Sequence, residues 1–200
     1  GGTLAYFTDT KSATNTFTVG DVKIKLDESN VNDPDGDRVT SNEYTGMLPG
    51  IQYKKDPVVT NTGKNGAYVR AVVTIENGMN WMGLYNENVW TAPQAEAFKK
   101  LICNKMGEGW SLEDYNYVTN AERGSTDFVA VLKYDGVLAA GKATTAMFEN
   151  IMLPTNATAS DITTRVAQNG VFHIDVVAQA IQADGFTSWN DAFKAFDAQK

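Results

Sequence analysis

The sequence predicts a mainly β protein, a jelly-roll-like antiparallel β-sandwich with one or two helices in an insertion and a C-terminal helix. Three observations lead to this class. Most segments alternate between apolar and polar residues with a period of two, as half-buried strands do. Turn residues recur between these segments, which gives about seven to nine strands. The chain has 200 residues, of which 42% are hydrophobic, and this suits one globular domain.

The N-terminal part contains two predicted strands. Residues 3–8 form a short apolar and aromatic run, and residues 8–16 follow as a polar stretch without a core pattern. The next strand covers residues 17–26, with a turn or bulge at residues 20–21. We therefore expect a terminal strand that is joined to the rest of the fold by a polar spacer.

Three longer strands are predicted where apolar residues share one face, around residues 69–75, 128–134 and 172–180. The last of them is apolar in places on both faces, as a central sandwich strand is. A proline followed by glycine at residues 49–50 suits a type II turn. The asparagine- and glycine-rich residues 61–66 predict a hairpin connection between two strands.

Two segments predict helices. Residues 93–106 place Phe98, Leu101 and Ile102 at helical spacing, after a proline that suits a first helical position and before the stop signal of Gly107. Near the C-terminus, a capping-box pattern precedes aromatic residues that recur on one helical face: Ser188, Trp189, Phe193 and Phe196. No Ser/Gly-rich or Pro-rich linker divides the chain. We therefore predict an N-terminal strand and spacer at residues 1–15 and one β-sandwich domain at residues 16–200. A helical and aromatic insertion occupies about residues 77–125 of that domain.

Composition excludes several classes of protein. The net charge of -7, from 24 acidic and 17 basic residues, repels phosphates, so nucleic acid is not an expected partner. One cysteine excludes an internal disulfide, and one histidine excludes the two-histidine zinc protease motif. No apolar run reaches the roughly 18 residues of a membrane span.

The acidic loop around residues 32–37 is the candidate metal site. Asp33, Asp35 and Asp37 stand at alternate positions and could converge on a hard cation, for which calcium is the candidate. The EF-hand pattern does not fit, because counting from Asp33 the glycine falls at the fourth position instead of the sixth. We therefore prefer a solvated loop with a turn at residues 34–36, and expect no obligatory cofactor.

His173 and Cys103 are the remaining candidates for chemistry. His173 could share a strand face with Asp175, but no serine or cysteine can be assigned as the nucleophile of such a pair. A structural, hydrogen-bonded histidine is therefore preferred. Cys103 follows Leu101 and Ile102 in the predicted helix, where a buried inert thiol is expected.

Aromatic residues gather in the insertion. They have two interpretations that the sequence leaves open: stacking on sugars or lining a protein interface, or covering the sheet from within the fold. The candidate interface residues are Trp81, Tyr85, Trp90 and Trp110.

The N-terminal strand is the most informative segment. Leu4 and Tyr6 point to one face and Ala5 and Phe7 to the other, so both faces are apolar. Such a strand can pair with its own sheet, which physics alone favours, or with the open edge of a neighbour's sheet. The second contact is heterologous, and its repetition gives an open filament.

The opening residues resemble a known family. Residues 3–10, Thr-Leu-Ala-Tyr-Phe-Thr-Asp-Thr, and residues 13–20, Ala-Thr-Asn-Thr-Phe-Thr-Val-Gly, resemble the start of the TasA/camelysin family of exported bacterial proteins. Residues 48–69 and 136–154 are similar to two later stretches of that family, and residues 176–186 resemble its clostridial-type members. The insertion at residues 77–125 lies outside the resemblance.

The resemblance implies a jelly-roll domain that is secreted through a dedicated signal peptidase and assembled into biofilm-matrix fibres. Carried over to this chain, the donor strand would be about residues 1–10, with Leu4, Tyr6 and Phe7 as anchors. Camelysin is classed as a metalloprotease, but this sequence lacks the ligands for such a site, so that activity is not carried over.

Together these observations predict a non-enzymatic structural subunit of a bacterial extracellular filament, in the matrix or at the cell surface. Identical subunits would polymerise by donor-strand complementation, with other matrix or cell-surface components as further partners. The polymer contact would come from six consecutive residues: Thr3, Leu4, Ala5, Tyr6, Phe7 and Thr8. Two alternatives are kept. One is a secreted carbohydrate- or surface-binding module that uses the aromatic insertion, and the other is a secreted metal-dependent hydrolase that uses the acidic loop and His173.

Overall fold

The computed structural model describes residues 8–12, 16–18, 22–85, 94–166 and 172–199. Its strands are β1 (Thr8–Ser12), β2 (Thr16–Thr18), β3 (Ile24–Asp27), β4 (Gln52–Lys54), β5 (Val58–Asn61), β6 (Ala67–Ile75), β7 (Trp110–Asn120), β8 (Ser125–Tyr134), β9 (Asn150–Met152) and β10 (Ile174–Gln182). Its helical segments are α1 (Gly78–Trp81), η1 (Met82–Tyr85), α2 (Gln94–Leu101), α3 (Ala159–Asp161), η2 (Ile162–Val166) and α4 (Trp189–Ala198).

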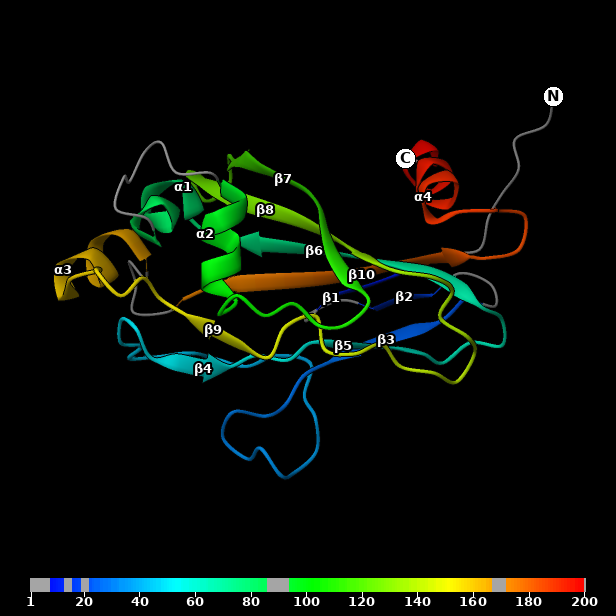
Figure 1. The fold of residues 1–200 in the computed structure, drawn as a ribbon, viewed down its shortest axis with the longest axis horizontal. Helices are drawn as coiled ribbons and strands as arrows, with labels where there is room; N and C mark the ends of the chain where they lie inside the picture. Colours follow the sequence, from blue (N-terminus) through cyan, green and yellow to red (C-terminus); the bar gives the residue numbers. More distant parts are fainter. Residues whose placement is uncertain (1–7, 13–15, 19–21, 86–93, 167–171, 200) are drawn as a thin grey trace.

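The strands form two layers (Figure 1). One layer is a six-stranded sheet in the order β2-β1-β10-β6-β8-β7, and every pairing in it is antiparallel. The other layer contains two short antiparallel pairs, β3 with β5 and β4 with β9. The predicted mainly β class, with antiparallel sheets and a C-terminal helix, is confirmed.

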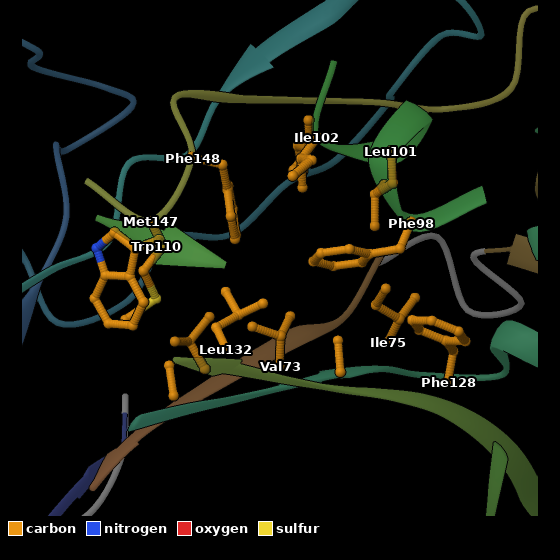
Figure 2. Packing of buried hydrophobic residues seen from close by; sticks show 14 of the residues in the cluster. Val73, Ile75, Phe98, Leu101, Ile102, Trp110, Phe128, Leu132, Met147 and Phe148 are labelled. Carbon is orange, nitrogen blue, oxygen red and sulfur yellow. The ribbon is translucent and has the colours of Figure 1, made fainter. Parts of the chain in front are cut away.

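The core lies between the large sheet and the elements that cover its inner face. Burial alternates along β8, where Phe128, Ala130 and Leu132 face inward, as the period of two predicts. Figure 2 shows Phe128 and Leu132 on the sheet side of the core, and Phe98 and Leu101 of α2 on the opposite side. Phe98 of α2 stacks on Phe128 with ring centroids 5.9 Å apart, so α2 closes one end of the core.

Helix α4 covers part of the outer face of the same sheet. Its N-cap is Ser188, whose hydroxyl accepts a hydrogen bond from the Asp191 N–H at 3.1 Å, as the sequence predicts for this start. Trp189 and Phe193 pack with Ile181 of β10 in a second apolar cluster. Arg70 of β6 lies 4.5 Å from the Phe193 ring centroid and so ties the helix to the sheet.

The connection at residues 61–66 differs from its prediction. β5 pairs with β3 while β6 pairs with β10 and β8, so these residues join the two layers and do not form a hairpin. The buried Asn61 amide holds the connection, because it donates to the carbonyls of Asn65 at 2.8 Å and Leu138 at 2.9 Å. Glycine- and asparagine-rich turns suit both connections, and only the partners of each strand distinguish them.

The segment at residues 77–125 is helical only in its first half. Helix α2 ends at Leu101, and Cys103 and Asn104 follow with φ of 59° and 56°, which terminates the helix before Gly107. Cys103 is half-buried outside the helix, and burial raises the pKa of its thiol. The second half forms β7, an edge strand paired with β8 and interrupted by a bulge between Leu112 and Asp114.

Candidate functional site

The N-terminal edge of the large sheet is formed by the chain's own first described residues. β1 pairs with β10 from Thr8 opposite Ile181 to Ser12 opposite Val177. β2 then pairs with β1, so it is the outer strand at this edge. Of the predicted donor residues, Thr8 therefore lies in its own sheet, whereas residues 3–7 lie outside the described residues.

A groove opens where β10 extends beyond β1. Ile174, Asp175 and Val176 pair with β6 on one side, and within the described residues no strand pairs with them on the β1 side. The cavity next to them measures about 290 Å³. We call it the β3–β10 groove, and define it by its apolar lining residues: Leu26, Tyr44, Pro57, Phe172, Ile174 and Val176.

A buried ion pair forms part of the groove lining. The Lys55 ammonium lies 3.1 Å from both carboxylate oxygens of Glu28, and the two side chains are 5% and 8% exposed. The same ammonium lies 5.6 Å from the ring centroid of Tyr44. Burial, followed by the nearby carboxylates of Glu28 and Asp56, raises the pKa of Tyr44, so its hydroxyl remains a donor, to the Lys54 carbonyl at 2.6 Å.

The wall of the groove at residues 40–44 belongs to a long loop that Asp56 anchors. Ser29 donates to the Asp56 carboxylate from its N–H at 2.8 Å and from its hydroxyl at 2.7 Å, and Arg38 donates to it at 3.3 Å. Arg38 also donates to Asp27 at 2.7 Å. Burial by itself would raise the pKa of Asp56, but the Ser29 hydrogen bonds and the Arg38 charge outweigh it and lower the pKa.

The lowered pKa of Asp56 gives a stability test. A carboxylate whose pKa is lower in the folded than in the unfolded protein stabilises the fold at pH values above its unfolded pKa, about 3.9. That stabilisation is lost as the pH falls through the folded pKa. We expect Asp56→Asn to lower the free energy of unfolding by about 1–3 kcal/mol at pH 7. Below about pH 4, the difference in unfolding free energy between this variant and the parent protein should shrink progressively.

Urea denaturation at a series of pH values measures this difference. Asp35→Asn, in the exposed part of the same loop, is the matched control and should change little at any pH. A deficit of Asp56→Asn that is equal at pH 7 and in acid would contradict the assignment of the stabilisation to the ionised carboxylate.

The acidic loop at residues 32–37 lies on the surface of the protein. Asp33, Asp35 and Asp37 are exposed, and the predicted turn is present at residues 34–35. Across the described part of the chain, no three carboxylate, histidine or cysteine side chains are grouped so that they could hold a metal. Calcium binding by these three residues stays a prediction.

His173 is paired, but with a residue that the sequence did not indicate. Its Nδ1 contacts the Glu76 carboxylate, not Asp175. Glu76 also lies 3.5 Å from Arg123, which binds the buried Asp127 at 2.5 Å. Glu76, directly after β6, therefore links His173, directly before β10, to Arg123 and through it to Asp127 of β8. No sequence signal shows this pair, because the two residues are 97 positions apart.

The aromatic candidates lie inside the fold. Trp81 is 0% exposed, Tyr85 8% and Trp110 6%, while Trp90 lies outside the described residues. Trp81 meets the ring of Phe172, edge to face, with centroids 5.4 Å apart. The sequence left two interpretations open for these residues, and the burial of Trp81, Tyr85 and Trp110 favours the one in which they lie inside the fold. A carbohydrate-binding module would need another aromatic platform.

Comparison of the chain with protein-family models, curated proteins and solved structures found no match. Within the described residues, no helix is both long and apolar enough to cross a membrane. The features that bear on function are therefore those of the molecule itself. They are an antiparallel sheet whose first strand, β1, is preceded in sequence by an apolar segment, and a groove beside the part of β10 that β1 does not cover.

Proposed function

We propose that the protein is a structural, non-enzymatic subunit of a bacterial extracellular filament that polymerises by strand complementation. The N-terminal segment of one subunit would complete a sheet of the next. One observation carries the proposal: β1 begins at Thr8 beside the edge of the large sheet, and the residues directly before it are apolar on both faces. The resemblance of residues 3–20 to the TasA/camelysin family points to the same class.

The chemistry of a strand suits such a contact. Main-chain hydrogen bonds provide binding that depends little on sequence, while alternate side chains provide specificity. Burial of each large apolar side chain, such as Leu4, Tyr6 or Phe7, would contribute about 1.5–3 kcal/mol. The donating segment and the accepting edge are different surfaces of one subunit, so the contact repeats without closing and yields a filament.

The two alternatives have less support. The hydrolase would need Asp33, Asp35, Asp37 and His173 to act together, and His173 is instead engaged by Glu76. The binding module would need exposed aromatic rings in the insertion, and three of its four candidates are buried. Further matrix or cell-surface partners are compatible with the proposal, and an extracellular location follows from it.

Deletion of residues 1–7 tests the proposed function, because it removes the apolar segment and leaves β1 in place. We expect the truncated protein to remain folded and monomeric, and to form no filaments under conditions in which the full chain does. Electron microscopy measures filaments, light scattering measures mass, and circular dichroism verifies the fold.

The matched control is Val137→Asp in the full chain, which changes a side chain that is 48% exposed and lies outside the N-terminal edge. This variant should still form filaments. Normal filaments from the truncated protein, or a full chain that stays monomeric under all assembly conditions, would contradict the proposal.

A further inference from the structure

We propose that the β3–β10 groove of a second copy receives residues 1–7, which add alongside Ile174, Asp175 and Val176. This inference rests on the proposed function and names the accepting surface and the donor's position. It differs from exchange of the whole N-terminal strand, since β1 remains in its own sheet and only the residues before it cross to the neighbour.

The sheet edge provides the backbone for such an addition. β1 follows β10 only as far as Val177, and β2 is already antiparallel to β1 at Thr16 opposite Lys11. The remaining three residues of β10 are strand residues bonded to β6. In an antiparallel sheet, their other side presents main-chain donors and acceptors toward the position that an added strand would take. A strand there would lie end to end with β1.

The groove provides the side-chain contacts. Ile174 and Val176 stand at alternate positions of β10, so their side chains lie on the same face of the strand. Both side chains line the groove. Leu26 of β3 and Phe172 line the same cavity. An incoming strand would place every second side chain between the two layers. Residues 4–7 meet this requirement in either register, because Leu4 and Tyr6 would point to one face of a strand and Ala5 and Phe7 to the other.

The direction of β1 excludes the chain's own groove as the acceptor. β1 runs from Thr8, opposite Ile181, toward Ser12, opposite Val177, so the chain before Thr8 enters the sheet from the end remote from the groove. In Figure 1 that end of β10 is its arrowhead, near α4. Ile174 lies seven residues from Ile181, a distance of roughly 24 Å along a strand.

Residues 1–7 could span at most about 24 Å when fully extended. Returning past β1 would consume all of that length and leave nothing to pair inside the groove. The groove of a second copy is not subject to this limit on length, because that copy can lie beyond the Thr8 end of β1. Because the donor leaves at one end of the sheet and the groove opens toward the other, successive copies would be related head to tail, which is the geometry of an open filament.

Cross-linking between two singly substituted chains tests the acceptor. In a Cys103→Ser background, one chain carries Ala5→Cys and the other carries Ser41→Cys, an exposed residue that lines the groove. A short bis-maleimide is added after co-assembly. We expect a cross-linked heterodimer at least tenfold more abundant than when the second chain carries Ser111→Cys, the matched serine in β7 at the opposite edge of the sheet.

The outcomes separate this inference from the proposed function. The filaments could depend on residues 1–7 while Ala5→Cys cross-links to Ser111→Cys, or to neither position. This result would overturn the assignment of the groove as the acceptor and would leave the filament proposal standing. A monomeric product from one chain carrying both Ala5→Cys and Ser41→Cys at high dilution would show that the segment occupies its own groove, and would overturn the inference. Absence of both filaments and cross-links would overturn both.

A second variant tests the groove without chemical linkage. Ile174→Asp places a charge on its apolar face, and we expect at least tenfold weaker assembly, measured as the critical concentration for filament formation. Val137→Asp introduces the same charge at a side chain that is 48% exposed and does not line the groove, and it should assemble normally. Normal assembly by a folded Ile174→Asp protein would overturn the groove assignment.

Discussion

Replacement of Lys55 by methionine should lower the free energy of unfolding by about 3–5 kcal/mol. The Lys55 ammonium binds both oxygens of Glu28 at 3.1 Å, and both side chains are almost completely shielded from water. Methionine fills a similar volume, so packing changes little. The loss arises because the Glu28 carboxylate stays buried without its cation.

The double variant Glu28→Met, Lys55→Met isolates the cause. Removing both charges removes the unpaired carboxylate, and we expect most of the stability to return, since buried ion pairs replaced by apolar residues are often close to neutral. Urea denaturation measures all three proteins. Lys54→Met is the matched surface control, because Lys54 is 45% exposed where it pairs with Glu149, and it should cost less than about 1 kcal/mol. A single Lys55→Met variant no less stable than Lys54→Met would contradict the prediction.

Replacement of Trp81 by alanine should cost about 3–5 kcal/mol, the range for large aromatic side chains removed from a core. Trp81 is fully buried and contacts Phe172 and Tyr85. Its indole N–H donates to the Glu76 carbonyl at 3.3 Å. Because Phe172 lines the β3–β10 groove, we also expect assembly to weaken in this variant even at temperatures where it remains folded.

Thermal and urea unfolding measure the stability of Trp81→Ala. Tyr115→Ala is the aromatic control: Tyr115 lies on β7 with 40% of its surface exposed, and its loss should cost much less. Parental stability combined with loss of glycan binding would contradict the core assignment of Trp81 and favour the carbohydrate-binding alternative.

The elements that the sequence predicts well are those whose signal is local. β6, β8 and β10 alternate apolar and polar residues, and each is found close to its expected range. Ser188 begins α4 because its hydroxyl can satisfy a free N–H of the first helical turn, which depends only on neighbouring residues. Strand β7 gives a weaker signal, since most of its residues are exposed at the sheet edge and its alternation is interrupted by a bulge.

The candidate site was less predictable, because its contacts join distant parts of the chain. Glu28 meets Lys55 across 27 positions, and His173 meets Glu76 across 97, and neither spacing is a motif. The burial of Trp81 also depends on what covers it, not on its own neighbours in sequence. The groove likewise exists only because β10 is longer than the part of it that β1 covers.

The order of amino acids therefore specifies the periodicity, the turns and the helix starts, and it places a two-faced apolar segment before a polar spacer. These features depend on the backbone and on side chains a few positions apart. Folding decides which strands become neighbours, which charges are buried together and where a sheet edge is left open. Those outcomes depend on many weak contacts between segments that are remote in sequence, so the edge that a neighbouring subunit could complete becomes visible only when all the strands are in place.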